Sequence, residues 1–341
     1  MRRELVGTVL AIVLGLLAGA LVMVVFDPTQ ISNVPRAYAA LLRGGLGSPK
    51  ALAETLATAA PLICAGLGIS LAFAGGLFNV GAQGQAIVGA SLAAYVGFAW
   101  TLPGGVHLIV GLLAGLLGGT IWGALAGWLR ARFGAHEVIT TIMANYIAAG
   151  LLTFALTTPT FQRPGRGDAI APLVHPTAAL PGLGRAHLGV LIALGAALLV
   201  GWLTQRSRAG LEIRAVGFNP VAAGHAGIAV EATIVRTMAI SGLLAGLAGA
   251  IVALAPDVHG RPTPLSDSLV GSVGWDAIAV AMLGRGRPAG VVAAGLFVGA
   301  LRAGSLAMQA QAGTGFDLAT VIQAVIMLVV ATPALLARVG R

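Results

Sequence analysis

Apolar runs close to twenty residues long recur along most of this 341-residue chain. About twenty apolar residues in a helix are needed to cross the hydrocarbon core of a bilayer. Only 9% of the residues are charged, whereas a soluble domain carries about 25% charged residues to face water. The chain therefore lacks the charge to coat a soluble globule. We expect an all-α, polytopic membrane helix bundle.

The twenty-residue template fits ten apolar segments, of which 273–284 and 289–303 are short. These two flank the Gly-Arg-Gly-Arg-Pro stretch at 284–288 and form either two half-length helices or one interrupted hairpin. We therefore expect eight to ten transmembrane segments, some broken or half-length, in a single transmembrane domain over residues 1–341. The other eight segments are predicted at 5–26, 51–74, 83–101, 106–129, 137–158, 187–204, 232–256 and 317–337.

Topology follows from the loops between these segments. The first run, 5–26, is longer than the core of about 7–15 residues found in a signal peptide, so it is predicted to be an uncleaved helix. With the N-terminus and C-terminus both cytoplasmic, the basic residues favour the inner loops, most of which are short. The proline-rich stretch 159–186 is then an external loop. The stretch 205–231, with a helical look, is a cytoplasmic loop suited to docking a partner.

Several chemistries are excluded by missing residues. A phosphate-binding loop needs Gly-Lys-Ser/Thr, but the only lysine is Lys50, after a proline. Six scattered histidines offer no helical ligand pair, and the single cysteine, Cys64, offers no cysteine cluster. Most of the basic residues lie between apolar segments without interleaved aromatic residues, so nucleic acid is not expected as a partner. We predict no metal site and no cofactor bound by this chain.

Glycines also recur at helical spacing inside the apolar runs. Gly242, Gly246 and Gly249 fall on one face of the predicted helix 232–256, and Gly111, Gly115 and Gly118 do the same in 106–129. Small residues let membrane helices approach closely. Ordinary packing within the bundle is the simpler interpretation, and a specific dimer face is the alternative.

Polar residues inside apolar runs are costly and commonly line a cavity or path in membrane proteins. Gln83 and Gln85 follow the break Gly-Gly-Leu-Phe-Asn-Val-Gly at 75–81, and irregular backbone at membrane depth is tolerated where it lines a cavity. Glu137 and Asp276 lie near predicted helix starts, where a capping charge is an equally good explanation. The predicted substrate path comprises Asn79, Gln83, Gln85, Glu137, Asn145 and Asp276.

Four stretches resemble the nucleoside and simple-sugar ABC permeases, in the order of that family. Residues 78–85 resemble Phe-Asn-Ile-Gly-x-Glu-Gly-Gln, and 136–148 resemble Asn-Glu-Val-Ile-x-Thr-Ile-Met-x-Asn-Tyr-Ile-Ala. Residues 214–228 resemble the family's inner loop, and 274–284 match Gly-Phe-Asp-Ala-Ile-Ala-Val-Ala-Leu-Leu-Gly. The second and fourth stretches favour the nucleoside branch. Gln83 stands where the family commonly has glutamate, and His136 replaces asparagine.

The resemblance implies the permease subunit of an ATP-binding-cassette importer in the bacterial cytoplasmic (inner) membrane. It implies a cytoplasmic ATPase that holds ATP and Mg, a second permease chain, identical or homologous, and an external substrate-binding protein. The cytoplasmic loop would carry a coupling helix that docks on the ATPase. The predicted coupling residues are Arg214, Asn219, Ala222, Ala223, Gly227 and Ile228.

The substrate and mechanism keep alternatives at this point. The expected function is import of a nucleoside by alternating access, with Gln83, Gln85 and Asn145 as polar contacts, because an amide can both donate and accept hydrogen bonds. A simple sugar such as ribose or galactose is the alternative within the same family. A stand-alone secondary transporter or channel, or a membrane enzyme, is a more remote possibility.

Overall fold

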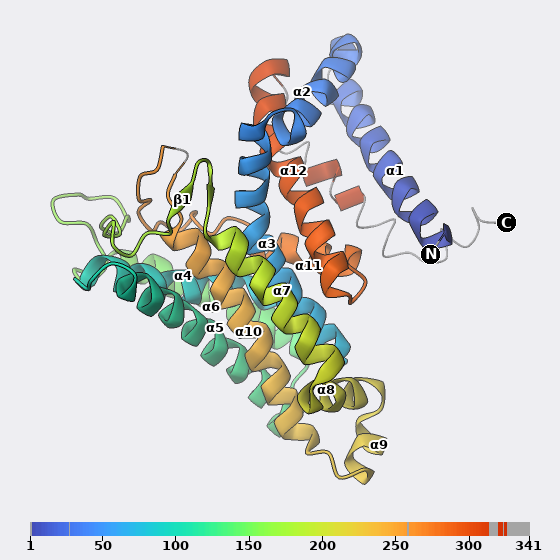
Figure 1. Cartoon of the computed structure of the whole chain (residues 1–341), viewed down its shortest axis with the longest axis vertical. Coiled ribbons are helices and arrows are strands. Elements are labelled where there is room, and N and C mark those ends of the chain that lie inside the picture. Colours follow the sequence, from blue (N-terminus) through green and yellow to red (C-terminus); the bar gives the residue numbers. More distant parts are fainter. Residues whose placement is uncertain (1, 27, 258, 314–319, 323, 326–341) are drawn as a thin grey trace. The chain divides into compact units, whose positions relative to one another are not determined.

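The computed structural model describes residues 2–26, 28–257, 259–313, 320–322 and 324–325, and most of them are helical (Figure 1). A short antiparallel hairpin pairs β1 (Gly182–Leu183) with β2 (Ala186–His187). The helices are α1 (Arg2–Phe26), the 3-10 helix η1 (Pro28–Asn33), α2 (Val34–Leu46), α3 (Pro49–Ala74), α4 (Ala82–Ala99), α5 (Val106–Phe133), α6 (Glu137–Leu156), α7 (Gly189–Arg206), α8 (Arg208–Phe218), α9 (Pro220–His225), α10 (Val230–Leu254), α11 (Val273–Leu283) and α12 (Pro288–Ala312).

The prediction of an all-α membrane protein is confirmed. Within the described residues, six helices are long and apolar enough to cross a bilayer: α3, α5, α6, α7, α10 and α12. Shorter apolar helical stretches lie at Val13–Val25 and Val273–Leu283. The predicted segment 317–337 lies outside the described residues, apart from 320–322 and 324–325, which are helical. The total of eight to ten crossings stays a prediction.

Two details of the sequence prediction are wrong. The segment 289–303 is not half-length, because α12 continues to Ala312 and has 25 residues. Its polar second half lowers the hydropathy, but the helical hydrogen bonds are local and continue through it. The connection predicted between 5–26 and 51–74 contains the helix α2, whose buried residues, among them Ala37 and Leu41, lie on one side only. A one-sided apolar stripe escapes a search for uniformly apolar runs.

The chain forms two compact units, which are described separately. Unit 1 comprises Met1–Ala59 and Leu296–Arg341, and unit 2 comprises Ala60–Gly295. In unit 1, α2 packs closely on α12, since a Cβ added at Gly45 would lie 2.6 Å from the carbonyl oxygen of Ala300. Thr55 of α3 donates a 2.6 Å hydrogen bond to the carbonyl oxygen of Gly45.

Close packing of glycines also joins the helices of unit 2. A Cβ added at Gly119 of α5 would collide with the carbonyl oxygen of Gly242 and lie 2.6 Å from the Cα of Gly246, both on α10. A Cβ added at Gly89 of α4 would lie 2.5 Å from the carbonyl oxygen of Gly246. In lipid the hydrophobic effect does not drive helices together, because the lipid tails are apolar too. Dispersion contacts between backbones this close stabilise the helix pair instead. The glycine spacing of α10 therefore serves packing within the bundle, as the simpler interpretation predicted.

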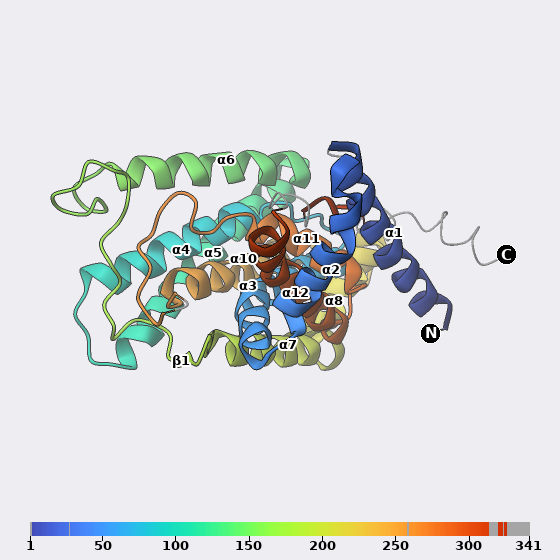
Figure 2. The ribbon, with the colours of Figure 1, turned by 90° about the horizontal axis from the view of Figure 1, so that it is seen from above.

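Helix α4 is largely enclosed within unit 2. It contacts α5, α6, α10 and α11, and the view in Figure 2 places α4, α5 and α10 between α6 on one side and α7 on the other. Most of its residues are buried, and many are alanine or glycine. A helix that is enclosed on all sides can carry polar side chains only where other elements supply hydrogen-bond partners.

The connecting segments of unit 2 gather at its two ends. Helices α8 and α9 lie at one end, beside the start of α10, and the β1–β2 hairpin lies at the other end (Figure 1). The loop 159–186 folds onto the hairpin end. There the amide of His175 donates to the carbonyl oxygen of Gly97, and the amide of Leu180 donates to that of Leu254, both at 2.8 Å. The two segments predicted on opposite sides of the membrane thus lie at opposite ends of unit 2.

The glycine contact between α5 and α10 can be tested with Gly119→Ala. The added methyl group has no space, and overpacking typically costs about 1–3 kcal/mol, so we expect a lower midpoint of thermal unfolding in detergent. The matched control is Gly150→Ala on α6, where an added Cβ meets nothing within 4 Å. The control should melt at or above the wild-type midpoint. Equal midpoints for the two variants would contradict the packing described.

Candidate functional site

The candidate site begins at the break between α3 and α4. Helix α3 ends at two glycines, and Gly76 has φ of +70°, a conformation that favours glycine. A side chain at Gly76 would also press on α8, because its Cβ would lie 3.1 Å from the Cα of Gly217. The chain then runs without regular structure to Gly81, where α4 begins. The backbone of this break needs hydrogen-bond partners from elsewhere.

Asn79, within the break, bonds one of these backbone amides and two side chains of neighbouring helices. Its Nδ2 donates to Oε1 of Gln85 at 2.9 Å and to Oγ of Ser241 on α10 at 2.7 Å. Its Oδ1 accepts from the backbone amide of Gly81 at 3.0 Å and from Nε2 of Gln85 at 3.2 Å. Asn79 therefore joins the break to the first turn of α4 and to the middle of α10.

Asn145 of α6 holds the start of α4 from the other side. Its Oδ1 accepts from the backbone amide of Gly84 at 2.7 Å, and its Nδ2 donates to the carbonyl oxygen of Val80 at 3.0 Å. The first amides of a helix have no partner within the helix. Asn145 acts as a cap supplied by a helix 61 residues away in sequence. One side chain must both donate and accept here, which an amide does and a carboxylate does not.

Gln83 connects the start of α4 to the start of α11. Its Nε2 donates to the carbonyl oxygen of Gly271 at 2.7 Å, and its Oε1 accepts from the backbone amide of Gly274 at 2.8 Å. Gly274 packs so closely on the backbone of Gln83 that a Cβ there would collide with it. The N-termini of two helices, α4 and α11, thus meet, and both present the positive end of their dipole.

The depth of these contacts matters for function. Ser241 is the twelfth of the 25 residues of α10, a helix long and apolar enough to span a bilayer. Asn79, which bonds Ser241, therefore lies beside the middle of that helix. We term Asn79, Gln83, Gln85, Asn145 and Ser241 the amide cluster, because each bonds the helix break or the start of α4, or belongs to it. Transport proteins place substrate sites where broken helices start at mid-membrane depth. The arrangement can offer polar groups to a ligand if its internal bonds are exchanged.

The structure brings four of the six predicted path residues together. Asn79, Gln83, Gln85 and Asn145 all belong to the amide cluster, and their exposed fractions are 1%, 7%, 1% and 5%. Their side chains bond to the protein itself in this structure, so contact with a substrate requires rearrangement. Their role in the path stays a prediction.

The other two predicted path residues lie at helix starts. Asp276 is in the first turn of α11, two residues after Gly274, and its Oδ2 accepts from Oγ of Ser272 at 3.2 Å. Glu137 begins α6 and lies 3.4 Å from Nε of Arg130, near the end of α5. Glu137 and Asn145 are separated by eight residues of helix, or about 12 Å of rise. Glu137 is therefore not part of the amide cluster.

Three residues of the site were not singled out in the sequence. Ser241 is a hydroxyl within a glycine-rich apolar helix, and Gly271 and Gly274 contribute backbone atoms. Gly274 stands first in the fourth of the resembling stretches, 274–284, which was the available signal. Serine and glycine are common in membrane helices, so neither residue type marks a site without knowledge of its neighbours.

The predicted coupling segment forms two helices, α8 and α9. Asn219 caps α9, since its Oδ1 accepts from the amides of Val221 and Ala222 at 3.0 and 3.1 Å. The helix ends at His225, Gly227 follows with φ of +83°, and the amide of Ile228 donates to the carbonyl oxygen of Ala223 at 3.0 Å. These bonds fix a sharply bounded short helix. Among the predicted residues, Ala223 is buried, Arg214 is half-buried and Ala222 is exposed.

Two apolar side chains flank the start of α9. Phe218 has an exposed fraction of 90% and Val221 of 66%. Phe218 ends α8 and Val221 lies in the first turn of α9, the two helices at one end of unit 2 (Figure 1). Exposed aromatic and aliphatic groups on a rigid turn are typical of a surface that docks another protein. The sequence prediction named the neighbouring small residues and missed this pair.

Comparisons with known proteins agree with the geometry. Residues 51–331 match the family described as branched-chain amino acid transport system / permease component. The guanosine ABC transporter permease protein NupP of Bacillus subtilis is 38% identical over 95% of this chain and 92% of its own length. The nucleoside ABC transporter permease protein NupB of Lactococcus lactis is 31% identical over 90% of this chain and 85% of its own. The glucose ABC transporter permease protein TsgB13 of Haloferax volcanii is 29% identical over 95% of this chain and 86% of its own length.

The six long apolar helices are those of a multi-pass membrane protein. The family match and the two relatives above 30% identity decide the rest: the chain belongs to the branched-chain amino acid transport system permease family, and is an ABC transporter permease subunit. The suspected resemblance is thereby confirmed at the level of the family. The search of solved structures found no significant match.

The capping role of Asn145 can be tested with Asn145→Leu, which keeps a similar volume. The substitution leaves the amide of Gly84 and the carbonyl of Val80 buried without this partner, at a cost of about 1–3 kcal/mol for each group. We expect a clearly lower thermal midpoint of the purified chain in detergent. Thr153→Val on the exposed side of the same helix is the control and should be neutral. A stable Asn145→Leu protein would show that Asn145 does not hold α4.

Proposed function

We propose that this chain is the membrane-spanning subunit of an ABC importer that carries nucleosides. The observation that carries the proposal is the similarity, over at least nine-tenths of the chain, to permeases named for guanosine and nucleosides. The amide cluster is chemically suited to such a ligand. Neutral amides can bond ribose hydroxyls and base edges alike, and they bring no charge into the middle of the bilayer.

In the proposed mechanism, the amide cluster exchanges partners as the subunit alternates between outward-open and inward-open states. The bonds of Gln83 to Gly271 and Gly274 hold the starts of α4 and α11 together. A ligand with several donors and acceptors can replace these bonds at little net cost, because an exchanged hydrogen bond differs little in free energy from the original. A ligand without such groups would leave backbone groups unpaired and would be rejected.

The energy for this exchange is proposed to come from a separate cytoplasmic ATPase that binds ATP and Mg, since this sequence has no phosphate-binding loop. The α8–α9 element is the proposed docking site, with both termini of the chain on the same, cytoplasmic side. The 159–186 loop would then face outward, toward an external substrate-binding protein. A second permease chain, identical or homologous, completes the proposed pore in the bacterial cytoplasmic membrane.

A simple sugar is the second candidate substrate. The observation in its favour is the glucose permease relative, which is 29% identical and aligns with 95% of this chain. Sugar hydroxyls would bond the same amides, so the cluster alone does not separate the two. A stand-alone secondary transporter is disfavoured because the relatives named above are ABC transporter permeases.

The substrate can be tested by uptake in cells from which the gene of this chain is deleted and then restored, with partner expression matched. We expect radiolabelled purine or pyrimidine nucleosides to depend on the chain, and glucose, ribose and galactose uptake to be unaffected. Unlabelled nucleoside should compete and free sugar should not. If the uptake of a sugar, and of no nucleoside, depends on this chain, the nucleoside proposal is refuted and the permease assignment stays in place.

Docking through α9 can be tested with Phe218→Ala. Loss of a central aromatic contact commonly costs about 2 kcal/mol or more, so the affinity for the ATPase should fall by about tenfold or more. The measurement is the amount of ATPase recovered with the tagged permease at increasing salt. Leu183→Ala in the hairpin at the other end of unit 2, with an exposed fraction of 54%, is the control. Equal recovery for both variants would exclude Phe218 from the docking surface.

A further inference from the structure

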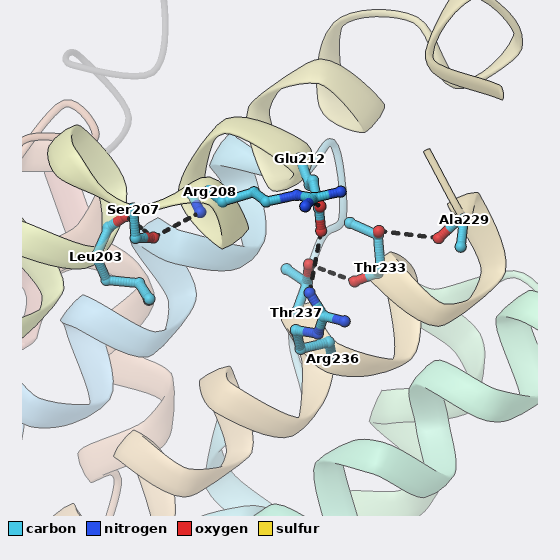
Figure 3. Close-up of polar contacts among 9 residues, drawn as sticks. Leu203, Ser207, Arg208, Glu212, Ala229, Thr233, Arg236 and Thr237 are labelled. Carbon is cyan, nitrogen blue, oxygen red and sulfur yellow. Dashed lines mark hydrogen bonds and ion pairs between the residues drawn. The ribbon is translucent and has the colours of Figure 1, made fainter. Parts of the chain in front are cut away.

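Glu212 of α8 lies between two arginines from different helices (Figure 3). Its Oε2 accepts from Nη1 of Arg236 on α10 at 3.0 Å, and its Oε1 accepts from Nε of Arg208, one turn earlier on α8, at 3.0 Å. Only 19% of the Glu212 side chain is exposed, compared with 49% for Arg236 and 92% for Arg208. One carboxylate oxygen is thus bonded within α8 by Arg208, and the other is bonded to α10 by Arg236.

Two hydroxyl groups near Arg236 bond instead within α10. Thr233 donates to the carbonyl oxygen of Ala229 at 2.9 Å, and Thr237 donates to that of Thr233 at 2.7 Å (Figure 3). Neither hydroxyl is therefore directed to α8. Of the polar side chains labelled on this part of α10, Arg236 is the one that reaches across to α8.

Helix α8 also packs closely against the end of α3 in this region. Gly217 lies against Gly76, and a Cβ added at Gly75 would lie 3.0 Å from Thr237 and 3.3 Å from Ile213. Packed surfaces transmit a push because atoms repel steeply on approach, but dispersion forces weaken quickly when the surfaces separate. Residues 226–229 join α9 to α10 through the chain, and an attractive side-chain link between α8 and α10 adds a second, direct route for a displacement of α8 away from α10.

We propose that the Glu212–Arg236 ion pair is the positioning contact that makes α10 follow α8 when the coupling element moves. The inference rests on the proposed docking of α8–α9 to an ATPase. Arg236 precedes Ser241 by five residues, or about 7.5 Å of helical rise. Ser241 accepts a hydrogen bond from Asn79 in the amide cluster. Movement of α10 therefore shifts a partner of the helix break directly.

The pair is suited to coupling more than to stability. Partly exposed ion pairs contribute little to the free energy of unfolding, because water competes for both charges. Removing the pair should leave the folded subunit and its docking surface in place. Its loss should appear as ATP hydrolysis that no longer drives transport.

The test uses the full transporter in proteoliposomes, with Glu212→Gln, Arg236→Gln, the double variant, and Arg208→Gln as the matched control. Glu212→Gln and Arg236→Gln should keep the wild-type thermal midpoint and ATPase recovery, while nucleoside import per ATP hydrolysed falls by about fivefold or more. The double variant should be no worse than either single variant, since all three lack the same link. Arg208→Gln removes only the contact within α8 and should keep at least half of the wild-type nucleoside import per ATP hydrolysed.

Two results with the single variants would overturn the proposal. One is wild-type import per ATP in Arg236→Gln, and the other is a loss in Arg208→Gln as deep as in Glu212→Gln. A double variant whose loss is the product of the single losses would equally contradict a shared link.

A second readout does not depend on the substrate. In a Cys64→Ala background, an environment-sensitive fluorophore at Ala239→Cys on α10 should change its emission when ADP and vanadate trap the ATPase. The change should persist with Arg208→Gln and vanish with Glu212→Gln or Arg236→Gln. Two outcomes would show that the ion pair does not drive α10. One is no change of emission in the labelled Cys64→Ala, Ala239→Cys protein, and the other is a change that persists when Glu212→Gln is added. Absence of nucleoside import by the wild type, with this pattern intact, would instead reject the nucleoside substrate alone.

Discussion

The structure of unit 2 depends on how backbone amides at the start of a helix are satisfied in the absence of water. In the hydrocarbon region an unpaired backbone group costs several kcal/mol by order of magnitude, so a helix that begins at mid-depth needs partners from its neighbours. Asn145 provides them for α4, and Gln83 provides them for α11. These bonds keep the break between α3 and α4 inside the protein, and they place polar groups where a solute would cross.

Glycine packing makes this arrangement possible. Helices α4 and α10 approach closely at Gly89 and Gly246, and Asn79, just before α4, bonds Ser241 of α10. Helix α10 also bonds two parts of unit 2. Arg236 near its start bonds α8, and Ser241 at its middle bonds the helix break. A single rigid helix thus joins the proposed ATPase docking surface to the proposed substrate path. Rigid-body movement of such an element is a common means of switching.

Sequence reasoning identified the break and the polar residues near it because amides are rare within apolar runs. It located Asn79, Gln83, Gln85 and Asn145, and Asn79 and Gln85 bond each other. It missed the glycine and serine partners, since Gly84 and Asn145 are 61 positions apart and residues such as Ser241 do not stand out. Helix starts were predicted well where charge and proline mark them, as at Glu137. Helix α2 and the second half of α12 were missed because hydropathy measures the run as a whole, while helices form by local bonds and can bury one side only.

The most direct measurement of the central claim is hydrogen exchange of residues 78–86 in the assembled transporter, at rest and during turnover with a nucleoside. Buried, bonded amides exchange only when the structure opens. The account predicts slow exchange at rest and faster exchange during turnover, with Gly81 and Gly84 responding together. Fast exchange at rest would contradict the capped helix break. Unchanged protection during active transport would contradict the proposal that the amide cluster exchanges its partners with the substrate.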